Sequence, residues 1–372
     1  MTRTLPAVAL SVLAALGLAA PIAAQTRVVN IYNWSDYVEP TVLEAFTRET
    51  GIKVRYDTFD ANETLETKLL AGKSGYDVVA PTAYFLQRQI KAGVFQKLDK
   101  SKLSNIGNVW PEIAARLAVY DPGNEYAVDY MWGTTGIGYN VKTARGILKT
   151  DSIQATMSAM SSWDIVFKPE NLAKFKDCGV HMLDSADDIL PAALHYLGLD
   201  PNTTAQADLD KAVDLLVKVR PSVRKFNSSE YLNALATGEI CLVVGWSGDI
   251  KQAQKRAAEA KGGVEIGYAI PSGGTQMFFD TLAIPKDAGN VAEAHAFIDY
   301  MLRPDVAAKN SNFLGYANGN LASQRLIDKS VLDDRTVYPD AETMKSLYLI
   351  TPRDQKTQRV LNRLWTRVKT GR

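Results

Sequence analysis

Strand-like and helix-like segments alternate along the chain from Val28 to about Gly133, and this alternation limits the fold more than any other feature of the sequence. Strand patterns occur at residues 28–32, 52–57, 76–80 and 126–132. The runs at 28–32 and 76–80 are typical of buried strands, whereas 52–57 alternates with a period of two. Segments with helical periodicity follow most of these runs. Such alternation is typical of a central sheet flanked by helices. The sequence therefore predicts an α/β fold.

A second α/β lobe is predicted to be inserted into the first. Longer helical segments occur after residue 142, at 189–197, 205–219, 228–237 and 250–260. Strands expected at 266–271 and 281–285, and a helix expected at 291–302, return the chain to the first lobe. We therefore expect lobe 1 to contain residues 25–134 and 272–312, and lobe 2 to contain residues 135–271 and 313–372.

The chain should cross between these lobes more than once. The cleft between two such lobes is the expected ligand site, and hinged lobes usually close around a ligand. An amphipathic, basic tail at 347–368 is expected to pack on the second lobe as a surface helix.

A glycine-rich run, residues 133–140, follows the strand at 126–132. Its spacing is GxxGxG rather than GxGxxG, and no Lys-Ser or Lys-Thr pair follows, so it does not indicate a nucleotide-binding loop. We interpret these glycines as a place where the chain turns and flexes as it crosses between the lobes.

Residues 1–24 have the pattern of a secretion signal. Arg3 provides the positive start, residues 7–20 are almost wholly apolar, and small residues precede Gln25. The apolar run is shorter than the ~20 residues that a membrane anchor needs. No cysteine lies near the cleavage site, so no lipid anchor is expected. The sequence predicts an exported, soluble protein without direct membrane insertion.

The charge balance of the chain argues against nucleic acid or an anionic membrane as the main partner. Removal of 24 residues from 372 leaves 348, enough for two ordinary domains. The signal contains one of the 42 basic residues and no acid, so 41 basic residues balance 41 acidic ones. A neutral chain lacks the electrostatic attraction that such partners require.

The sequence contains two cysteines, Cys178 and Cys241. An even pair in an exported protein is most simply a disulfide. Two buried free thiols are the alternative, and a metal pair is disfavoured because no CxxC motif or His cluster accompanies the cysteines.

A candidate binding stretch lies where the first strand ends. Trp34, Ser35, Asp36 and Tyr37 stand between this strand and a helix that Pro40 begins. Ligands of open α/β sheets bind at such strand ends. An aromatic wall beside a carboxylate suits a small organic cation. The helix cap should be Glu39, so capping does not explain Asp36.

Two further carboxylates have competing explanations. Asp249 precedes a helix and forms an Asp-x-x-Gln capping box with Gln252, so we expect it to cap that helix; capping leaves one oxygen free to bind. Asp280 lies in an apolar strand, where an ionised carboxylate needs a partner. That partner is either an internal salt bridge or a ligand cation.

Other candidates are weaker, and signals for catalysis are poor. Tyr316 lies in a polar turn, and this pattern by itself indicates only a loop. Asp188 lies near the start of a helix, where acidic residues are common for structural reasons, so its position does not require a function. No HExxH motif, Cys-His pairing, closely spaced acid pair or calcium-binding loop occurs. We therefore expect neither an enzyme nor a bound metal or cofactor.

The motifs "IYNWSDYVEP", "GYDVVAPTAYFL", "MWGTTGIGYN", "VVGWSGD" and "FFDTLAIP" resemble those of periplasmic polyamine-binding proteins, most closely the putrescine-binding type. The resemblance covers the whole mature chain. It implies a type II periplasmic binding protein fold, with two α/β lobes and a cleft at the hinge. It also implies a polyamine ligand, an ABC transporter permease as partner, a periplasmic location and a Cys178–Cys241 disulfide; we expect a monomer.

The resemblance assigns roles to residues at matching positions. It implies that the methylene chain lies against an aromatic wall formed by Trp34, Tyr37, Trp246, Phe278 and Tyr316. Asp249 and Asp280 would hold one terminal ammonium, and Ser35 and Asp36 would hold the other end, with Asp188 reaching it through water. Thr82 and Tyr84 would border the pocket.

The sequence departs from the putrescine-type pattern at one place. Ser35-Asp36 matches that pattern, whereas Tyr84 resembles the spermidine type. Putrescine is the expected ligand, and spermidine, cadaverine or a related amine is the alternative. Two alternatives to a transport function remain. The protein could be a ligand sensor that uses the same cleft, or an exported hydrolase that uses its carboxylates as acid and base.

Overall fold

The computed structural model describes residues 1–2 and 27–371. The predicted secretion signal, residues 1–24, lies outside the described residues except for its first two. In the described part of the chain, no helix combines the length and the apolar character needed to cross a bilayer.

The described strands form one path of hydrogen-bonded neighbours in the order β2-β1-β3-β9-β4-β7-β5-β6, with β8 also paired to β4. Their bounds are β1 Val28–Trp34, β2 Lys53–Phe59, β3 Val78–Val79, β4 Ala127–Asn140, β5 Val180–Met182, β6 Lys225–Phe226, β7 Leu242–Trp246, β8 Ile266–Ala269 and β9 Met277–Ala283. At one end β1 lies parallel to β2 and β3, and at the other β5 lies parallel to β6 and β7. The predicted α/β class is confirmed.

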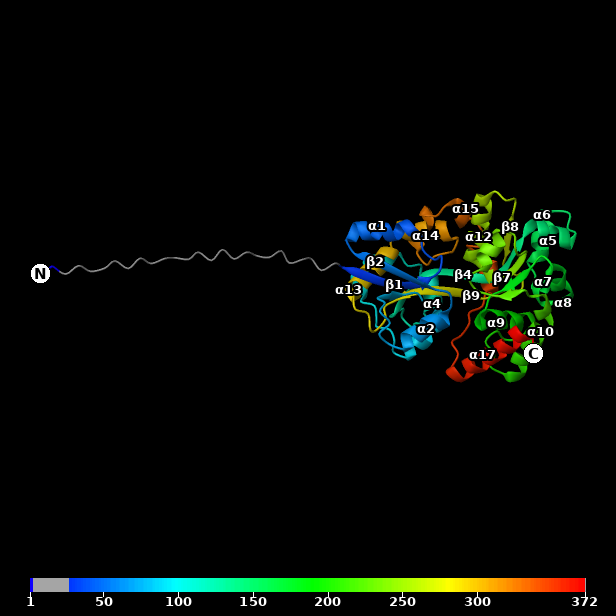
Figure 1. The fold of residues 1–372 in the computed structure, drawn as a ribbon, viewed down its shortest axis with the longest axis horizontal. Coiled ribbons are helices and arrows are strands. Elements are labelled where there is room, and N and C mark those ends of the chain that lie inside the picture. The colour runs from blue at the N-terminus through cyan, green and yellow to red at the C-terminus, as the bar shows by residue number, and fades with distance from the viewer. Residues whose placement is uncertain (3–26, 372) are drawn as a thin grey trace.

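Strand β4 belongs to both halves of this sheet. Its first half pairs antiparallel with β9, and its second half, from Thr135, pairs antiparallel with β7 and β8. Figure 1 shows β4 and β9 running through the middle of the molecule, between β1 and β2 on one side and β7 and β8 on the other. The halves are thus joined by continuous strands.

The interpretation of residues 133–140 as a flexible turn is wrong, because they form the buried second half of β4. Their glycines are needed for close packing instead. A Cβ atom at Gly136 would lie 2.5 Å from the carbonyl oxygen of Ala269, and one at Gly138 would lie 2.8 Å from Ile250. The strand expected at 266–271 is β8, and it pairs with β4 in the second half of the sheet. The prediction that this strand returns the chain to the first half is therefore wrong, and β9 makes that return instead.

Helices cover the sheet, and several begin and end where the sequence indicates. Their bounds are α1 Pro40–Thr50, α2 Asn62–Leu70, α3 Ala83–Lys91, α4 Pro111–Leu117, α5 Val141–Leu148, α6 Ile153–Met160, α7 Asp164–Phe167, α8 Pro169–Leu172, α9 Ala186–Tyr196, α10 Gln206–Val219, α11 Tyr231–Ala236, α12 Ser247–Ala260, α13 Val291–Met301, α14 Pro304–Leu314, α15 Lys329–Leu332, α16 Ala341–Ser346 and α17 Gln355–Thr370. As predicted, Glu39 caps α1 by accepting a hydrogen bond from the Val42 N–H, and Gly51 ends it with a φ of 69°.

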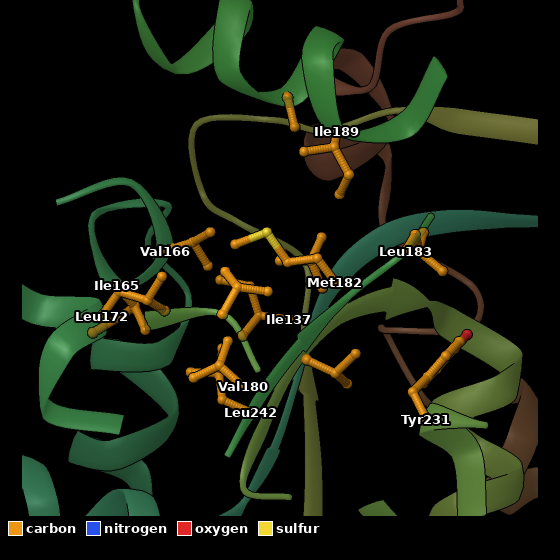
Figure 2. Packing of buried hydrophobic residues seen from close by; sticks show 14 of the residues in the cluster. Ile137, Ile165, Val166, Leu172, Val180, Met182, Leu183, Ile189, Tyr231 and Leu242 are labelled. Carbon is orange, nitrogen blue, oxygen red and sulfur yellow. The ribbon is translucent and has the colours of Figure 1, made fainter. Parts of the chain in front are cut away.

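Each half of the sheet has its own apolar core. Figure 2 shows part of the core around β5 and β7, where Ile137, Val180, Met182 and Leu242 pack together. The C-terminal helix α17 contributes Trp365 to this same core, which confirms that the helical part of the predicted tail packs on this half. The tail helix begins at Gln355 rather than at 347, and Leu347 packs in another cluster. A separate cluster surrounds β1, β3 and β9.

Cys178 and Cys241 form the predicted disulfide, with 5.5 Å between their Cα atoms. Residues 327–347 pack beside Phe85 and Trp132, on strands and helices of the first half, before the chain reaches α17. The lobe boundaries given above stay a prediction.

Candidate functional site

A cavity lies where the carboxyl ends of the parallel strands of both halves face each other. It contains about 640 Å³ of space between protein atoms, part of it open to solvent. The ends of β1, β2 and β3 supply one wall, the ends of β6 and β7 and the start of α9 supply the opposite wall, and β9 crosses between them.

All of the residues that the sequence singled out for binding line this cavity, although their roles as ligand contacts stay predictions. They are Trp34, Ser35, Asp36, Tyr37, Thr82, Tyr84, Asp188, Trp246, Asp249, Phe278, Asp280 and Tyr316. Sequence positions more than two hundred residues apart therefore meet in one place.

Asp280 is buried in the wall on β9 and is held by hydroxyl groups. The Tyr37 hydroxyl donates to Oδ2 at 2.7 Å, and the Thr82 hydroxyl donates to Oδ1 at 2.6 Å. No Lys, Arg or His of the described chain forms a salt bridge with it, which rules out the internal ion pair within that part of the chain. Burial raises the pKa of Asp280 to about 7. A ligand cation remains as the partner that would favour its ionised form.

Asp249 does not cap α12, so the predicted capping box is wrong. The helix begins at Ser247, its N-cap is Trp246, and no side chain accepts a capping hydrogen bond there. Instead the carboxylate of Asp249 accepts hydrogen bonds from the hydroxyls of Tyr231 and Tyr316, both at 2.8 Å. Burial raises its pKa to about 6. The carboxylate is turned toward tyrosines at the cavity rather than toward the helix N–H groups.

Asp188 is another buried carboxylate of the cavity. Its Oδ1 accepts hydrogen bonds from the Thr135 hydroxyl at 2.7 Å and from the Trp246 indole N–H at 3.2 Å. Burial raises the pKa of Asp188. The neighbouring acids from the same sequence cluster have basic partners: Asp187 pairs with Arg353 and Asp184 with Lys369. Helix-start enrichment alone therefore does not explain Asp188.

Aromatic rings form a continuous wall of the cavity. Trp246 is in edge contact with Trp34, with ring centroids 5.8 Å apart, and with Phe278 at 6.5 Å. Tyr316 continues the row, 6.3 Å from Phe278 and 5.1 Å from Tyr37. Ring faces and edges offer apolar contact to methylene groups and attract cations.

Ser35 and Asp36 lie at the exposed rim of the cavity. Asp36 has a positive φ of 53°, and its carboxylate accepts a hydrogen bond from Arg256 at 3.1 Å. Arg256 lies on α12, so this ion pair joins the two walls of the cavity. Asp36 is therefore already paired, whereas Asp249 and Asp280 are held by neutral hydroxyls.

The charged side chains that line the cavity all have the same sign. Asp36, Asp60, Asp188, Asp249 and Asp280 face it, and none of the described lining residues is Lys, Arg or His. Such a cavity favours a cation and disfavours phosphate, carboxylate or sulfate groups. Aromatic walls between the carboxylates further favour an elongated organic cation.

Sequence reasoning missed part of the cavity, namely Phe59, Asp60, Asn62, Ser228, Ser229, Leu232 and Gln276. Residues 59–62 follow the second predicted strand, so the strand-end rule that selected Trp34 would also have selected them. Gln276 carries no such signal, because only the pairing of β9 with β4 brings it to the cavity.

Two α/β halves joined by crossing strands, with an acidic, aromatic cavity between them, define the class of two-lobed binding proteins. Residues 41–337 match the family model described as bacterial extracellular solute-binding protein. The chain is 50% identical to the putrescine-binding periplasmic protein SpuD of Pseudomonas aeruginosa, across 94% of each chain. It is 47% identical to the putrescine-binding periplasmic protein PotF of Escherichia coli, again across 94% of each. The chain thus belongs to the bacterial extracellular solute-binding proteins.

A solved structure supports the same assignment. The spermidine/putrescine ABC transporter substrate-binding protein PotD of Streptococcus pneumoniae has a TM-score of 0.75 and 31% identity, covering 93% of this chain and 99% of the other. The fold is the type II periplasmic binding protein fold, as the resemblance implied. The protein is a solute-binding protein and not an enzyme.

Proposed function

We propose that this protein binds a polyamine in the cavity, with putrescine as the first candidate, and delivers it to the permease of an ABC importer. One observation carries the proposal. Asp280 is buried and Asp249 is partly buried in an aromatic cavity, and each is held by two neutral hydroxyls rather than by a basic side chain of the described residues. A protonated amine supplies the missing charge.

The shape and chemistry of the cavity fit a linear amine. Carboxylates hold ammonium groups by charge-assisted hydrogen bonds worth ~1.5–3 kcal/mol each. The row of rings from Trp34 to Tyr316 offers apolar surface to the methylene groups between the nitrogens. A sugar or a neutral amino acid would leave several carboxylates without a counter-charge.

The relatives support the remaining parts of the proposal. Two of them are named as putrescine-binding periplasmic proteins, and the structural neighbour as a substrate-binding protein of an ABC transporter. By this likeness the present protein acts in the periplasm after removal of residues 1–24, as a monomer whose lobes close around the amine. Its membrane partner is the cognate permease.

A thermal-shift panel tests the proposal. The purified chain, freed of bound amine, is heated with putrescine, cadaverine, spermidine, basic amino acids or sugars. A ligand present at a hundred times its dissociation constant stabilises the folded state by ~2.7 kcal/mol, so putrescine should raise the melting temperature by several degrees. A rise with sugars or amino acids alone, and none with any polyamine, would contradict the proposed function.

A further inference from the structure

A second groove between the two halves carries the opposite charge to the ligand cavity. Helices α2 and α3 of the first half form one wall, and residues 352–362, which lead into α17, form the other. Figure 1 shows α2 and α17 on the same side of the central strands. The groove contains about 1180 Å³ of space between protein atoms, part of it open to solvent. Among the described residues it shares no lining residue with the ligand cavity, and we call it the basic groove.

Basic side chains outnumber acidic ones in the lining of the basic groove. Its charged residues are Arg88, Lys91, Arg353, Arg359, Glu66 and Asp354. Glu66 accepts hydrogen bonds from Arg88 at 2.5 and 2.6 Å, and Asp354 caps α17 by accepting from the Thr357 N–H. The acids are thus engaged within the protein, and the net charge of the lining is positive.

Lys91 and Arg359 are the basic residues of the groove that a partner can reach. Both side chains are exposed, and no acidic residue of the described chain forms a salt bridge with either of them. Lys356 and Arg363 lie three residues before and four residues after Arg359, so these three share one face of α17. They too are exposed and have no acidic partner in the part of the chain that the structure describes. This concentration of positive charge attracts an anionic partner.

The basic groove also offers apolar contact, which favours a protein segment over a lipid headgroup or a free anion. Leu70 lines it and is 55% exposed. The guanidinium of Arg88 lies 3.6 Å from the ring centroid of Phe85, so packing as well as Glu66 holds it in place. Apolar and arginine side chains are common in protein interfaces. A concave surface also fits a chain segment better than it fits the flat surface of a membrane.

Both halves are needed to form the basic groove. Arg88 donates a hydrogen bond to Gln358 at 3.2 Å, which joins α3 to α17. Helix α3 contributes Leu86 to the core of the first half, whereas α17 contributes Trp365 to the core of the second. A segment bound in the groove therefore contacts both halves at once, which suits a permease that receives a ligand from between them.

We propose that the basic groove is a docking site for an acidic segment of a partner protein, and that this segment belongs to the permease. This inference rests on the proposed function, in which a permease accepts the amine. Aspartate or glutamate side chains of the segment pair with Lys91 on one wall and Arg359 on the other. An apolar side chain of the segment packs against Leu70.

Binding to the cognate permease complex in lipid nanodiscs tests the inference by biolayer interferometry with the putrescine-loaded protein. Charge reversal replaces attraction by repulsion, so Lys91→Glu and Arg359→Glu should each weaken binding to the permease about tenfold. Lys91→Arg keeps the charge and should bind like the wild type. Calorimetry should give the wild-type affinity for putrescine in every variant, since neither residue lines the ligand cavity.

Lys142→Glu is the matched control for the charge reversals. Lys142 is an exposed lysine of α5 in the second half, and it lies outside the basic groove. Its reversal changes the net charge of the protein by the same amount as Lys91→Glu, and it should leave permease binding unchanged. Equal weakening by Lys142→Glu would show that net charge, and not the groove, controls the association, and would overturn the proposal.

The other outcomes separate the docking site from the function on which it rests. Wild-type binding to the permease by Lys91→Glu and Arg359→Glu overturns the docking site and leaves delivery to a permease standing. Equal binding of the wild type to permease-free nanodiscs that contain phosphatidylglycerol assigns the groove to a lipid surface and also overturns the proposal. Absence of any binding between the wild-type protein and the permease overturns the delivery step of the proposed function itself.

Discussion

At the scale of one residue, Asp280 is a buried carboxylate whose side-chain partners in the described chain are neutral hydroxyls. Tyr37 and Thr82 donate hydrogen bonds that orient both of its oxygens, but neither donor carries a charge. Burial therefore dominates and raises the pKa to about 7. A nearby cation such as an ammonium group would favour the ionised form of this carboxylate.

The substitution Asp280→Asn should lower the affinity for putrescine by more than about tenfold, because the charge-assisted hydrogen bond becomes a neutral one. Calorimetry measures the loss. Asp129→Asn is the matched control, because Asp129 is also buried but does not line the cavity. The affinity of this variant for putrescine should stay within about twofold of that of the wild type. Unaltered binding by Asp280→Asn would refute its assigned role.

At the scale of the element, β4 explains how two halves can share one cavity. The strand is buried along its whole length and pairs with β9, β7 and β8 in turn. Glycines at its second half let neighbouring chains approach closely, as at Gly136 beside Ala269 and Tyr268. Continuous strand pairing thus joins the two halves, and the Thr135 hydroxyl donates a hydrogen bond to Asp188 at 2.7 Å.

Gly136→Ala should therefore reduce the free energy of unfolding, by roughly 1–3 kcal/mol, as overpacking in a core does. The new methyl group would meet a backbone carbonyl that cannot move independently. Gly146→Ala is the control, since Gly146 lies within α5 with open space around it, and alanine there should be neutral or stabilising. Urea denaturation compares the two; equal stability would show that β4 tolerates the methyl group.

At the scale of the whole molecule, ligand binding should be coupled to proton release. Asp249 on α12 and Asp280 on β9 have pKa values raised by burial to about 6 and about 7. The empty folded protein therefore holds protons that the unfolded chain has already lost between about pH 4 and 7. Its free energy of unfolding falls as the pH rises through that range.

A bound ammonium favours the ionised carboxylates, so its binding should expel these protons. We expect the affinity for putrescine to rise as the pH increases through about 6 and about 7 and to level off above that range, since the amine itself stays protonated until near pH 10. At pH 6.5 the calorimetric enthalpy should depend on the ionisation enthalpy of the buffer. An enthalpy that is identical in phosphate and Tris would contradict the coupling; Asp280→Asn should weaken it.

Much of the site could be predicted because its residues follow strand ends. Trp34 ends β1 and Tyr37 follows it, Thr82 comes after β3 and Trp246 ends β7. Parallel strands place such positions at one edge of a sheet. Gln276 could not be predicted, since its position depends on the register of β9 against β4. The pairing of Asp36 with Arg256 was also hidden, because it joins separate elements.

The sequence alone determined the α/β class, most strand and helix positions and a set of residues that line one acidic cavity, because periodicity, caps and strand ends are local properties. Only the tertiary structure decided that the glycine run is a strand, that Asp249 faces tyrosines instead of capping α12, and that Gln276 and Asp188 share a wall. Those outcomes depend on which distant strands pair and what they bury. Local sequence does not contain that information.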